Sequence, residues 1–332
     1  MAIRIGINGF GRIGRYAARL LAGRQDLELV AVNARADNSS LAHLLKYDSV
    51  HGTFSGSVKP NEKGFLLQDK QVMVTRYGPG EWNWSEVGAD IVLETTGKFR
   101  DRESCQQHLA GGAKKVLISA PGKNSDLTLV MGVNDSDLSP EHSIISNASC
   151  TTNCLAPVTK VVHDSFGIEH GIMTTIHSYT MSQRILDGSH KDLRRARAAA
   201  MSMIPTTTGA AKAVTEVIPS LKGKLDGMAI RVPTPNVSLV DLSAELSQDA
   251  SAEEVNRSLK EASQGELKGI LGYSEEPLVS VDYVGSSFGG VLDAPLTSCI
   301  DKRLLKLIVW YDNEAGFTHQ LLRLAERVGK LL

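Results

Sequence analysis

A glycine pattern near the amino terminus constrains the fold more than any other feature of the sequence. Gly9, Gly11 and Gly14 stand between an alternating apolar run at 3–7 and apolar residues that recur at helical spacing. A second strand-like run follows at 27–32, so the segment predicts a strand–helix–strand unit with the glycines in its first turn. Glycine there permits a tight turn and lets a pyrophosphate approach the free N–H groups of the helix N-terminus. The pattern favours a dinucleotide site over a turn that needs glycine only for packing.

The length of 332 residues favours two domains, and the pattern changes near residue 150. Before it, short apolar runs end in polar or glycine-containing segments, which indicates a doubly wound parallel sheet with its ligand at the strand ends. These runs are 91–93, 116–118 and 144–145. After it, alternation across 240–246 predicts an antiparallel sheet with one wet face. We therefore expect an α/β chain with a cofactor domain over 1–149, an α+β domain with a mixed or antiparallel sheet over 150–312, and a C-terminal helix over 313–332.

Composition and charge exclude several classes of protein. The 36 Lys and Arg against 37 Asp and Glu give a net charge of −1, without the basic excess of nucleic-acid-binding proteins. No apolar run approaches the ~18 residues of a membrane helix. The four cysteines form neither a disulfide framework nor a CxxC zinc pair, and the N-terminus lacks a signal-peptide pattern. We expect a cytoplasmic protein with no membrane partner, nucleic-acid partner or metal.

Cys150 is the candidate nucleophile. It comes directly after a predicted strand and is flanked by Ser149, Thr151 and Thr152, hydroxyl residues that favour the start of a helix. The partial positive charge of a helix N-terminus lowers the pKa of a thiol, so we expect a reactive thiolate. The alternative for an intracellular cysteine is a buried structural thiol. We assign that alternative to Cys154, one turn further into the helix.

A nucleophilic thiol needs a base, and His177 is the candidate. It closes the apolar run 172–176 and therefore lies at a strand end, where sites are built. A lone histidine is more often structural, and residue patterns alone do not separate His177 from His51 or His190.

Arginines and hydroxyl residues further along the chain form a candidate phosphate site. Arginines cluster in 192–197, and Arg231 stands at a predicted strand end. These cations are either solvated surface charges or bind phosphate together with the hydroxyl and backbone donors of 206–209.

The acidic residue that usually holds the adenine ribose is absent from the end of the second strand. The chain has Ala34 and Arg35 there, with Asp37 three residues beyond Ala34. Asp37 can take the place of the acidic residue that holds the ribose only if the loop folds back toward the strand end. Arg35 is either a solvated loop charge or attracts the 2′-phosphate of NADP.

Longer segments of the chain resemble the phosphorylating glyceraldehyde-3-phosphate dehydrogenases. The segments that carry the resemblance occur in order over essentially the whole chain, at 7–15 (INGFGRIGR), 149–154 (SCTTNC), 177–180 (HSYT), 190–200 (HKDLRRARAAA), 205–212 (PTTTGAAK), 231–236 (RVPTPN) and 310–314 (WYDNE). The resemblance implies a Rossmann domain completed by the C-terminal helix, a catalytic domain and a homotetramer.

The resemblance also implies the reaction and its residues. Cys150 attacks the aldehyde of D-glyceraldehyde 3-phosphate, His177 takes the proton, and inorganic phosphate cleaves the resulting thioester to 1,3-bisphosphoglycerate. The substrate phosphate is assigned to Thr180, Arg195 and Arg231, and the attacking phosphate to Ser149, Thr151, Thr208 and Gly209. The positions implied for the cofactor are Gly9, Gly11, Arg12, Ile13, Gly14, Ala34, Arg35, Arg76, Thr96, Ser119, Ser189 and Asn313.

Two departures from the usual family pattern bear on the cofactor. Ala34 replaces the usual Asp, and Gly188-Ser189 replaces a bulky Leu-Pro pair in a loop that in this family reaches a neighbouring subunit's adenosine site. The second departure resembles the Ala-Ser pair of photosynthetic NADP-using members. We therefore expect NADP or NAD as cofactor, with NADP favoured.

Two other functions are compatible with these residues. One is erythrose-4-phosphate dehydrogenase, a relative whose product is released to water, and the other is a non-catalytic nucleotide- or RNA-binding relative. The intact run 206–209 favours the phosphorylating reaction, and the intact Cys150 and His177 argue against a silent relative.

Overall fold

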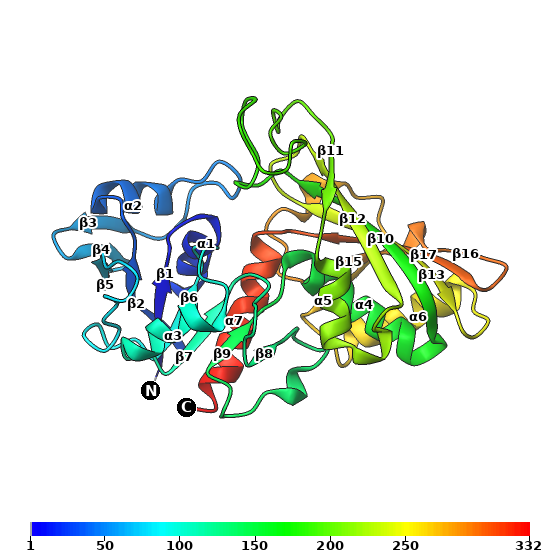
Figure 1. Cartoon of the computed structure of the whole chain (residues 1–332), viewed down its shortest axis with the longest axis horizontal. Helices are drawn as coiled ribbons and strands as arrows, with labels where there is room; N and C mark the ends of the chain where they lie inside the picture. The colour runs from blue at the N-terminus through cyan, green and yellow to red at the C-terminus, as the bar shows by residue number, and fades with distance from the viewer. Residues whose placement is uncertain (1) are drawn as a thin grey trace. The chain divides into compact units, whose positions relative to one another are not determined.

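The computed structural model describes residues 2–332 and divides into two compact units (Figure 1). Unit 1 comprises the residues up to Leu129 together with Asp135–Ala148 and Thr318–Leu332. Unit 2 comprises Val130–Asn134 and Ser149–Phe317. The last helix, α7 (Ala315–Gly329), begins in unit 2 and continues in unit 1. It begins two residues later than the sequence predicted, because the Asp312 carboxylate accepts the backbone N–H groups of Glu314 and Ala315 in the preceding turn.

Unit 1 is built on a sheet whose strand order, within residues 2–332, is β3-β4-β5-β2-β1-β6-β7-β9-β8. The strands are β1 (Ile3–Asn8), β2 (Leu27–Asn33), β3 (Val58–Asn61), β4 (Gly64–Leu67), β5 (Lys70–Thr75), β6 (Ile91–Glu94), β7 (Lys115–Ile118), β8 (Leu127–Thr128) and β9 (Ile144–Ser146). β1 pairs in parallel with β2 on one side and with β6 on the other. The strand order reverses at β1, the place where open α/β sheets bind ligands. The predicted doubly wound fold is confirmed.

The segments that connect the strands of unit 1 contain its helices and two successive antiparallel hairpins, β3–β4 and β4–β5. The helices are α1 (Arg12–Leu21), α2 (Asn38–Lys46) and α3 (Arg102–Ala110). β3, β4 and β5 pair antiparallel, an excursion that the sequence patterns did not indicate. β5 then returns to the sheet in parallel with β2, so its carboxyl end lies beside the end of β2. The C-terminal part of α7 packs against β1, where Gly329 lies against Ile3.

Unit 2 is built on a mixed sheet, as predicted, with the order β11-β12-β10-β13-β17-β15-β14 over the described residues. The strands are β10 (Ile168–Ser178), β11 (Ile204–Thr207), β12 (Leu225–Val232), β13 (Ser238–Leu246), β14 (Leu271–Ser274), β15 (Gly290–Asp293), β16 (Ser298–Ile300) and β17 (Leu304–Tyr311). β10 runs parallel to β12 and antiparallel to β13. Along β13, buried side chains alternate with half-buried ones, so the alternation read in the sequence is confirmed.

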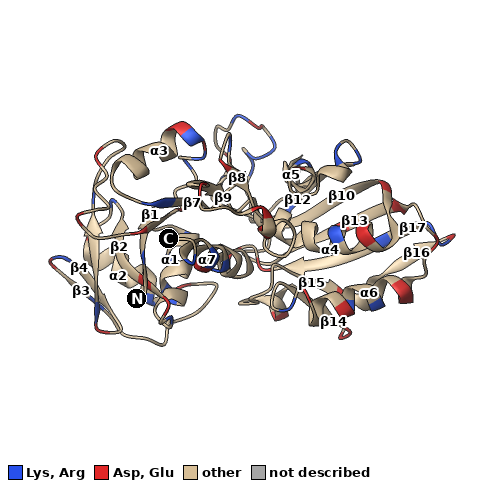
Figure 2. Cartoon of the chain, turned by 90° about the horizontal axis from the view of Figure 1, so that it is seen from below, with Lys and Arg blue, Asp and Glu red and all other residues tan. Residues whose placement is uncertain are grey.

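The helices of unit 2 are α4 (Cys150–Phe166), α5 (Ala210–Val217) and α6 (Ala252–Gln264). The N-terminus of α6 is closed by reciprocal hydrogen bonds between Ser251 and Glu254. Among the helices of residues 2–332, none is long and apolar enough to cross a membrane. Figure 2 shows Lys and Arg interspersed with Asp and Glu along each unit, for example on α6.

Candidate active site

Cys150 is the first residue of α4, directly after the cap residue Ser149. The Ser149 Oγ accepts a hydrogen bond of 3.0 Å from the backbone N–H of Thr152, which fixes the first turn of the helix. Cys150 is half-buried, whereas Cys154 is fully buried. The sequence prediction that Cys150 lies at a helix N-terminus and Cys154 one turn inside is confirmed.

His177 is the histidine that faces Cys150. It lies one residue before the end of β10, is 5% exposed, and its Nε2 is 3.5 Å from the Cys150 Sγ. His51, which the sequence did not separate from it, packs against the ring of Tyr16 in unit 1. His190 makes contacts with the backbone of Asp192. Of the three candidate histidines, His177 is therefore the one that the structure places beside Cys150.

The orientation of the His177 ring presents Nε2 to the thiol. The Ser178 carbonyl lies 2.7 Å from Nδ1 and can only accept, so it favours the tautomer that carries its hydrogen on Nδ1 and keeps the Nε2 lone pair toward Sγ. The Arg231 Nη1 can only donate, and it lies 2.8 Å from the same Nδ1 and 3.0 Å from the Ser178 carbonyl, so its contact with the ring favours the opposite tautomer. In the tautomer that Ser178 favours, His177 can accept the proton of the Cys150 thiol.

Burial and a neighbouring cation set the charge states of this pair. Burial, followed by the positive charge of Arg231, lowers the pKa of His177 to about 3. Burial also raises the pKa of the Cys150 thiol, and it outweighs the lowering by Arg231 and by the backbone N–H groups at the start of α4. Burial thus opposes the thiolate that the sequence analysis expects the helix N-terminus to favour. A neutral thiol faces a neutral imidazole.

Two arginines supply positive charge around this pair. Arg231 lies near the end of β12, and its buried Nε has no hydrogen-bond partner in the part of the chain described. The Arg195 Nε donates to the Thr206 Oγ1 at 3.0 Å, and Asp192 accepts from the same hydroxyl at 2.6 Å. The charge of Arg195 lowers the pKa of both Arg231 and His177, so the two guanidinium groups act on one region. Such a region favours an anion such as a phosphate.

The other residues predicted to bind phosphate are distributed over three segments of unit 2. The Thr180 Oγ1 lies 2.9 Å from the Ser182 Oγ, outside the reactive pair. Gly209 is the cap residue of α5 and has no side chain of its own to cap the helix, and the Thr208 Oγ1 accepts from the backbone N–H of Ala210, the first residue of α5. The Thr151 hydroxyl points instead into the interior, 2.8 Å from the Tyr311 Oη.

Tyr311 is a residue at this site to which the sequence analysis gave no role. Its hydroxyl lies 2.8 Å from both the Thr151 and Thr175 hydroxyls, and its ring stands edge-on to His177 at 5.9 Å. Tyr311 is 1% exposed and therefore supports the His177 ring from inside. Its place at the end of an apolar strand offered no signal, because its partners lie 160 and 136 residues away in the chain.

A pocket of about 390 Å³ lies at the strand ends of unit 1. It is lined by six of the predicted cofactor residues, Gly9, Gly11, Ala34, Arg35, Arg76 and Thr96. Four others in unit 1 are not among its lining residues: Arg12, which pairs with Asp48, and Ile13, Gly14 and Ser119. Among the described residues that line the pocket, none is acidic. This lining suits a polyanionic ligand.

The glycine turn at this pocket fits the phosphates of a dinucleotide. Gly9 has φ +92°, and a Cβ there would meet the Thr96 backbone nitrogen at 2.9 Å. At Gly14 a Cβ would lie 2.4 Å from the Gly9 carbonyl oxygen, so α1 and the turn pack closely. Gly11 faces open space and leaves the N-terminus of α1 without a side-chain cap. A phosphate can therefore approach the backbone N–H groups directly.

The ribose end of the pocket carries cations in place of an acid. Asp37 does not fold back, because it accepts from the Ser40 N–H and caps α2. The Arg76 Nη2 donates to the Ala36 carbonyl at 2.8 Å. Arg35 is exposed and makes no side-chain hydrogen bond or ion pair within residues 2–332. The loops that follow β2 and β5 thus present one guanidinium group each, from Arg35 and Arg76, to the pocket.

The two remaining predicted cofactor residues belong to unit 2. The Asn313 Oδ1 accepts hydrogen bonds from Ser178 at 2.8 Å and Ser238 at 3.0 Å, so its amide nitrogen is left as a donor. Ser189 is exposed, and its carbonyl accepts from Arg184.

Comparison with known proteins assigns both units to one family. Residues 3–102 match the NAD binding domain of glyceraldehyde 3-phosphate dehydrogenase, and residues 149–313 match its C-terminal domain. The chain is 58% identical over 327 residues to the glyceraldehyde-3-phosphate dehydrogenase of Geobacillus stearothermophilus, which covers 98% of each chain. It is 54% identical to glyceraldehyde-3-phosphate dehydrogenase 1 of Bacillus subtilis and 53% identical to glyceraldehyde-3-phosphate dehydrogenase 2 of a Nostoc species, covering 99% of each chain in both cases. With a thiol and imidazole in contact in one unit and a dinucleotide turn in the other, the chain belongs to the glyceraldehyde-3-phosphate dehydrogenase family.

Proposed function

We propose that the chain catalyses the reversible, phosphorylating oxidation of D-glyceraldehyde 3-phosphate to 1,3-bisphosphoglycerate with a nicotinamide cofactor. The observation that carries this proposal is the 3.5 Å contact between the Cys150 Sγ and the lone pair of the His177 Nε2 beside Arg231. A thiol beside a base forms covalent intermediates with aldehydes, and the neighbouring cations suit a substrate that carries a phosphate.

The first step uses the neutral thiol and imidazole. The His177 Nε2 takes the thiol proton as the Cys150 sulfur adds to the aldehyde carbon, which gives a thiohemiacetal. The protonated ring and the backbone N–H groups at the start of α4 then stabilise the oxyanion, and the ring returns its proton to that oxygen, which gives the thiohemiacetal hydroxyl and restores the neutral imidazole. His177 next accepts the proton of the thiohemiacetal hydroxyl as the carbonyl of the thioester forms. When bound, the nicotinamide accepts the hydride that leaves the same carbon.

The second step releases the acyl group to inorganic phosphate. A phosphate oxygen attacks the thioester carbon, the carbon–sulfur bond breaks, and Cys150 leaves as a thiolate that takes up a proton. We assign Thr180, Arg195 and Arg231 to the phosphate of the substrate. We assign Ser149, Thr151, Thr208 and Gly209 to the attacking phosphate. The second assignment is supported by the N-terminus of α5, where the cap residue Gly209 has no side chain and the neighbouring Thr208 offers a hydroxyl beside the first backbone N–H groups of the helix.

We propose that the enzyme accepts both NADP and NAD and prefers NADP. The absence of an acidic side chain from the described pocket lining and the presence of Arg35 and Arg76 there support this preference. A 2′-phosphate gains from nearby guanidinium groups, whereas a free ribose hydroxyl is repelled by nothing in the lining. Ser189 belongs to the same proposal, as a hydroxyl that a neighbouring copy would bring to the adenosine end.

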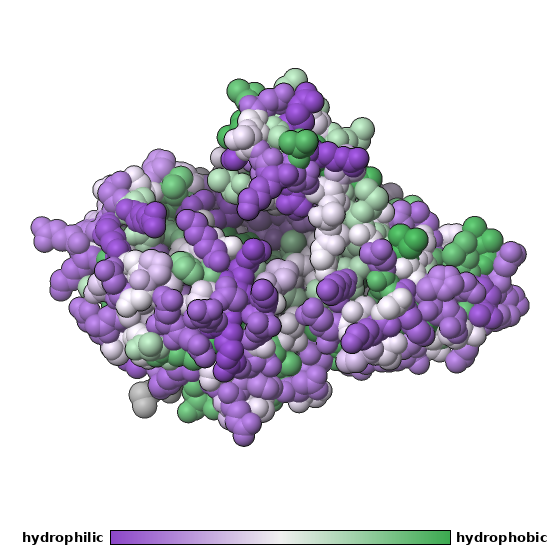
Figure 3. Space-filling model, in the orientation of Figure 1, coloured by the Kyte–Doolittle hydropathy of each residue, from purple (hydrophilic) through white to green (hydrophobic). Residues whose placement is uncertain are grey.

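We propose that the functional assembly is a homotetramer. The segment 179–203 of unit 2 exposes large apolar side chains, which include Met181 at 92%, Ile185 at 86% and Met201 at 81%. Figure 3 shows apolar atoms beside polar ones on this segment, which forms the green loops above β11 in Figure 1. Exposed apolar residues gathered in one segment support burial against another copy. Sedimentation velocity at micromolar protein tests the assembly, and a monomer would contradict it.

The activity is tested by following cofactor reduction with purified protein and D-glyceraldehyde 3-phosphate. Reduction should require inorganic phosphate and should give an acyl phosphate that hydroxylamine traps. Phosphate-independent oxidation of erythrose 4-phosphate at a higher kcat/KM would instead assign the chain to the hydrolytic relative. Failure to reduce NAD or NADP with either aldehyde would leave a nucleotide-binding protein without this activity.

A further inference from the structure

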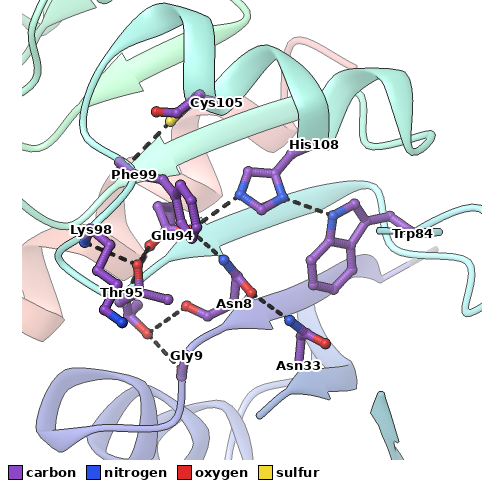
Figure 4. A network of polar contacts seen from close by, with 12 residues as sticks. Asn8, Gly9, Asn33, Trp84, Glu94, Thr95, Lys98, Phe99, Cys105 and His108 are labelled. Carbon is purple, nitrogen blue, oxygen red and sulfur yellow. Dashed lines mark hydrogen bonds and ion pairs between the residues drawn. The ribbon is translucent and has the colours of Figure 1, made fainter. Parts of the chain in front are cut away.

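A buried polar network lies at the strand ends of unit 1, and no step of the proposed reaction uses it (Figure 4). Its centre is Glu94, the last residue of β6, which is 1% exposed. Asn8 at the end of β1, Asn33 at the end of β2 and His108 of α3 are also buried. We call these four residues, with Thr96 and Trp84, the Glu94 network.

The Glu94 carboxylate accepts hydrogen bonds from four neutral donors. Its Oε2 accepts from the Asn8 Nδ2 at 2.5 Å and from the His108 Nε2 at 3.1 Å. Its Oε1 accepts from the Thr96 backbone N–H at 2.7 Å and from the Thr96 hydroxyl. These donors use the acceptor capacity of both carboxylate oxygens. Within residues 2–332, Glu94 contacts no Lys or Arg.

Trp84 fixes the hydrogen of His108. The indole Nε1 can only donate, and it lies 3.0 Å from the His108 Nδ1, which must therefore accept. His108 then carries its hydrogen on Nε2 and donates it to Glu94. Since the Nδ1 lone pair is engaged, the ring stays neutral, and Glu94 is an anion held by neutral groups.

Tyr77 fixes the other branch of the network in the same way. The Asn33 Oδ1 accepts from the Tyr77 backbone N–H at 2.9 Å, and the Asn33 Nδ2 donates to the Tyr77 carbonyl at 3.1 Å. Asn33 must therefore donate to the Asn8 Oδ1, at 2.8 Å. This leaves the Asn8 amide as a donor toward Glu94. The two branches thus end on the Trp84 indole N–H and on the Tyr77 backbone, whose donor and acceptor roles cannot be exchanged.

An ionised carboxylate is consequently the one state of residue 94 that satisfies all of these partners. A glutamine amide facing Asn8 and His108 would meet two donors, and turning Asn8 or His108 around would move the conflict to Tyr77 or Trp84. If the glutamine amide were flipped, its NH2 group would instead face the Thr96 backbone N–H, which is also a donor. An unsatisfied buried donor destabilises the arrangement that contains it, so the network resists every alternative orientation.

The network supports the walls of the proposed cofactor pocket. Asn8, Asn33, Tyr77 and Thr96 all line it, from the ends of four neighbouring strands, whereas Glu94 and His108 lie behind them. The Thr95 Oγ1 extends the connection by donating to the Gly9 carbonyl at 2.7 Å. We propose that Glu94 is a positioning residue for the cofactor: as a buried anion it holds the glycine turn and the Thr96 turn in the geometry that the dinucleotide needs. This inference rests on the proposed use of a nicotinamide dinucleotide.

Cofactor affinity measured without turnover tests this role. Titration calorimetry of the whole protein with NAD, NADP and ADP-ribose should show Glu94→Gln binding each of them at least ~10-fold more weakly. The matched control is Glu103→Gln, an exposed glutamate on α3 that lies outside this network. Unchanged affinity in Glu94→Gln would overturn the inference. No binding of any of the three by the wild type would overturn the proposed function instead.

A kinetic comparison separates positioning from general loosening of the protein. In Glu94→Gln the KM for the cofactor should rise at least ~10-fold, while kcat at saturating cofactor and the alkylation rate of Cys150 in the cofactor-free protein stay within about twofold. A fall in kcat and alkylation rate together, with KM unchanged, would contradict a positioning role.

Trp84→Phe provides a second variant that depends on the direction of the hydrogen bonds. In the wild type this change removes the donor to His108 and weakens cofactor binding. In Glu94→Gln it removes the donor that opposes reversal of His108, so the ring can accept from the new amide. The loss of affinity caused by Trp84→Phe should therefore be at least ~3-fold smaller in the Glu94→Gln background. Equal losses in the two backgrounds would contradict the assignment of hydrogen-bond directions.

Discussion

The reactive pair of unit 2 and the Glu94 network of unit 1 are both buried and polar, yet they differ in how fully their groups are satisfied. Each donor of the Glu94 network meets an acceptor, and both ends of the network are fixed by groups that cannot reverse. At the reactive pair, the Cys150 Sγ lies 3.5 Å from the His177 Nε2, and the buried Arg231 Nε lacks a partner in the described structure. The comparison indicates that a binding framework uses up its hydrogen bonds, whereas a reactive site keeps some for its substrate.

The two clusters also handle charge differently. The Glu94 carboxylate accepts hydrogen bonds from four neutral donors in place of a cation. At Cys150, burial raises the pKa of the thiol and outweighs the lowering by Arg231 and by the hydrogen-bond donors at the start of α4. Charge at the reactive site therefore develops during the reaction, when a proton moves to His177. A permanent carboxylate such as Glu94 is suited to holding a binding site in shape, whereas a thiol such as Cys150, which loses its proton as it attacks, is suited to catalysis.

Replacing Cys150 should produce the largest effect on the reactive site. Cys150→Ser should lower kcat by roughly 10⁴-fold or more, because the hydroxyl is a far weaker nucleophile and cannot form the thioester. Cys154→Ser is the matched control and should retain activity, since the buried Cys154 does not contact His177. Iodoacetamide should label Cys150 first, as peptide mass mapping would show. Inactivation accompanied by labelling at another cysteine, with Cys150 unmodified, would contradict the assignment of Cys150 as the nucleophile.

Replacing His177 should have the next largest effect. His177→Asn should lower kcat by ~100- to 10,000-fold and slow the alkylation of Cys150, because the proton acceptor beside the sulfur is lost. Cofactor affinity should be unchanged, in contrast to Glu94→Gln. His170→Asn, on the same strand but exposed, is the control. Near wild-type turnover in His177→Asn would require a different base.

The sequence predicted the parts of the molecule that depend on short segments. The glycine turn, the parallel strands, the helix that begins at Cys150 and the strand that ends near His177 all follow from local periodicity and capping residues. The Glu94 network was missed because its partners are 86 residues apart for Asn8 and 14 for His108. Polar residues at the ends of three neighbouring apolar strands were the available signal.

The direction of the Cys150 pKa shift was also missed, for a related reason. The helix N-terminus was visible in the sequence, but the burial that outweighs it arises from the packing of distant strands around α4. Tyr311 illustrates the same limit, since it reaches the site from β17. Local chemistry can thus be read from the sequence, whereas the balance between a local dipole and burial needs the assembled fold.

A charge placed at residue 34 should change cofactor choice by a moderate amount. Ala34→Asp should lower the ratio of the NADP to the NAD kcat/KM by ~10- to 100-fold, because its carboxylate would repel the 2′-phosphate. Ala34→Asn has nearly the same size without the charge and should change the ratio little. Initial rates with both cofactors provide the measurement. An unchanged ratio in Ala34→Asp, or a wild type without any NADP-linked activity, would make this an NAD enzyme.

The smallest expected effect concerns Asp90, which lies one residue before β6, the strand that ends at Glu94. Burial alone would raise the pKa of Asp90, but hydrogen bonds from Arg4 and Lys114 outweigh it and lower the pKa to about 2. A carboxylate whose folded-state pKa is depressed stabilises the protein above its unfolded pKa of about 4, and this contribution disappears as the pH falls toward 2. Arg4 and Lys114 are about half exposed, so screening limits the contribution to about 1 kcal/mol.

Asp90→Asn should therefore lower the urea midpoint at pH 7 and leave it nearly unchanged near pH 2, with Asp69→Asn, an exposed aspartate of unit 1, as the control. Cofactor affinity should not change, because Asp90 is paired with cations at the opposite end of the strand from the pocket. Asp90 and Glu94 thus have different expected roles, the first in the stability of the protein and the second in cofactor binding. A loss of cofactor affinity in Asp90→Asn as large as that in Glu94→Gln would mean that any buried charge near β6 supports the pocket, and the specific hydrogen-bond argument for Glu94 would fail.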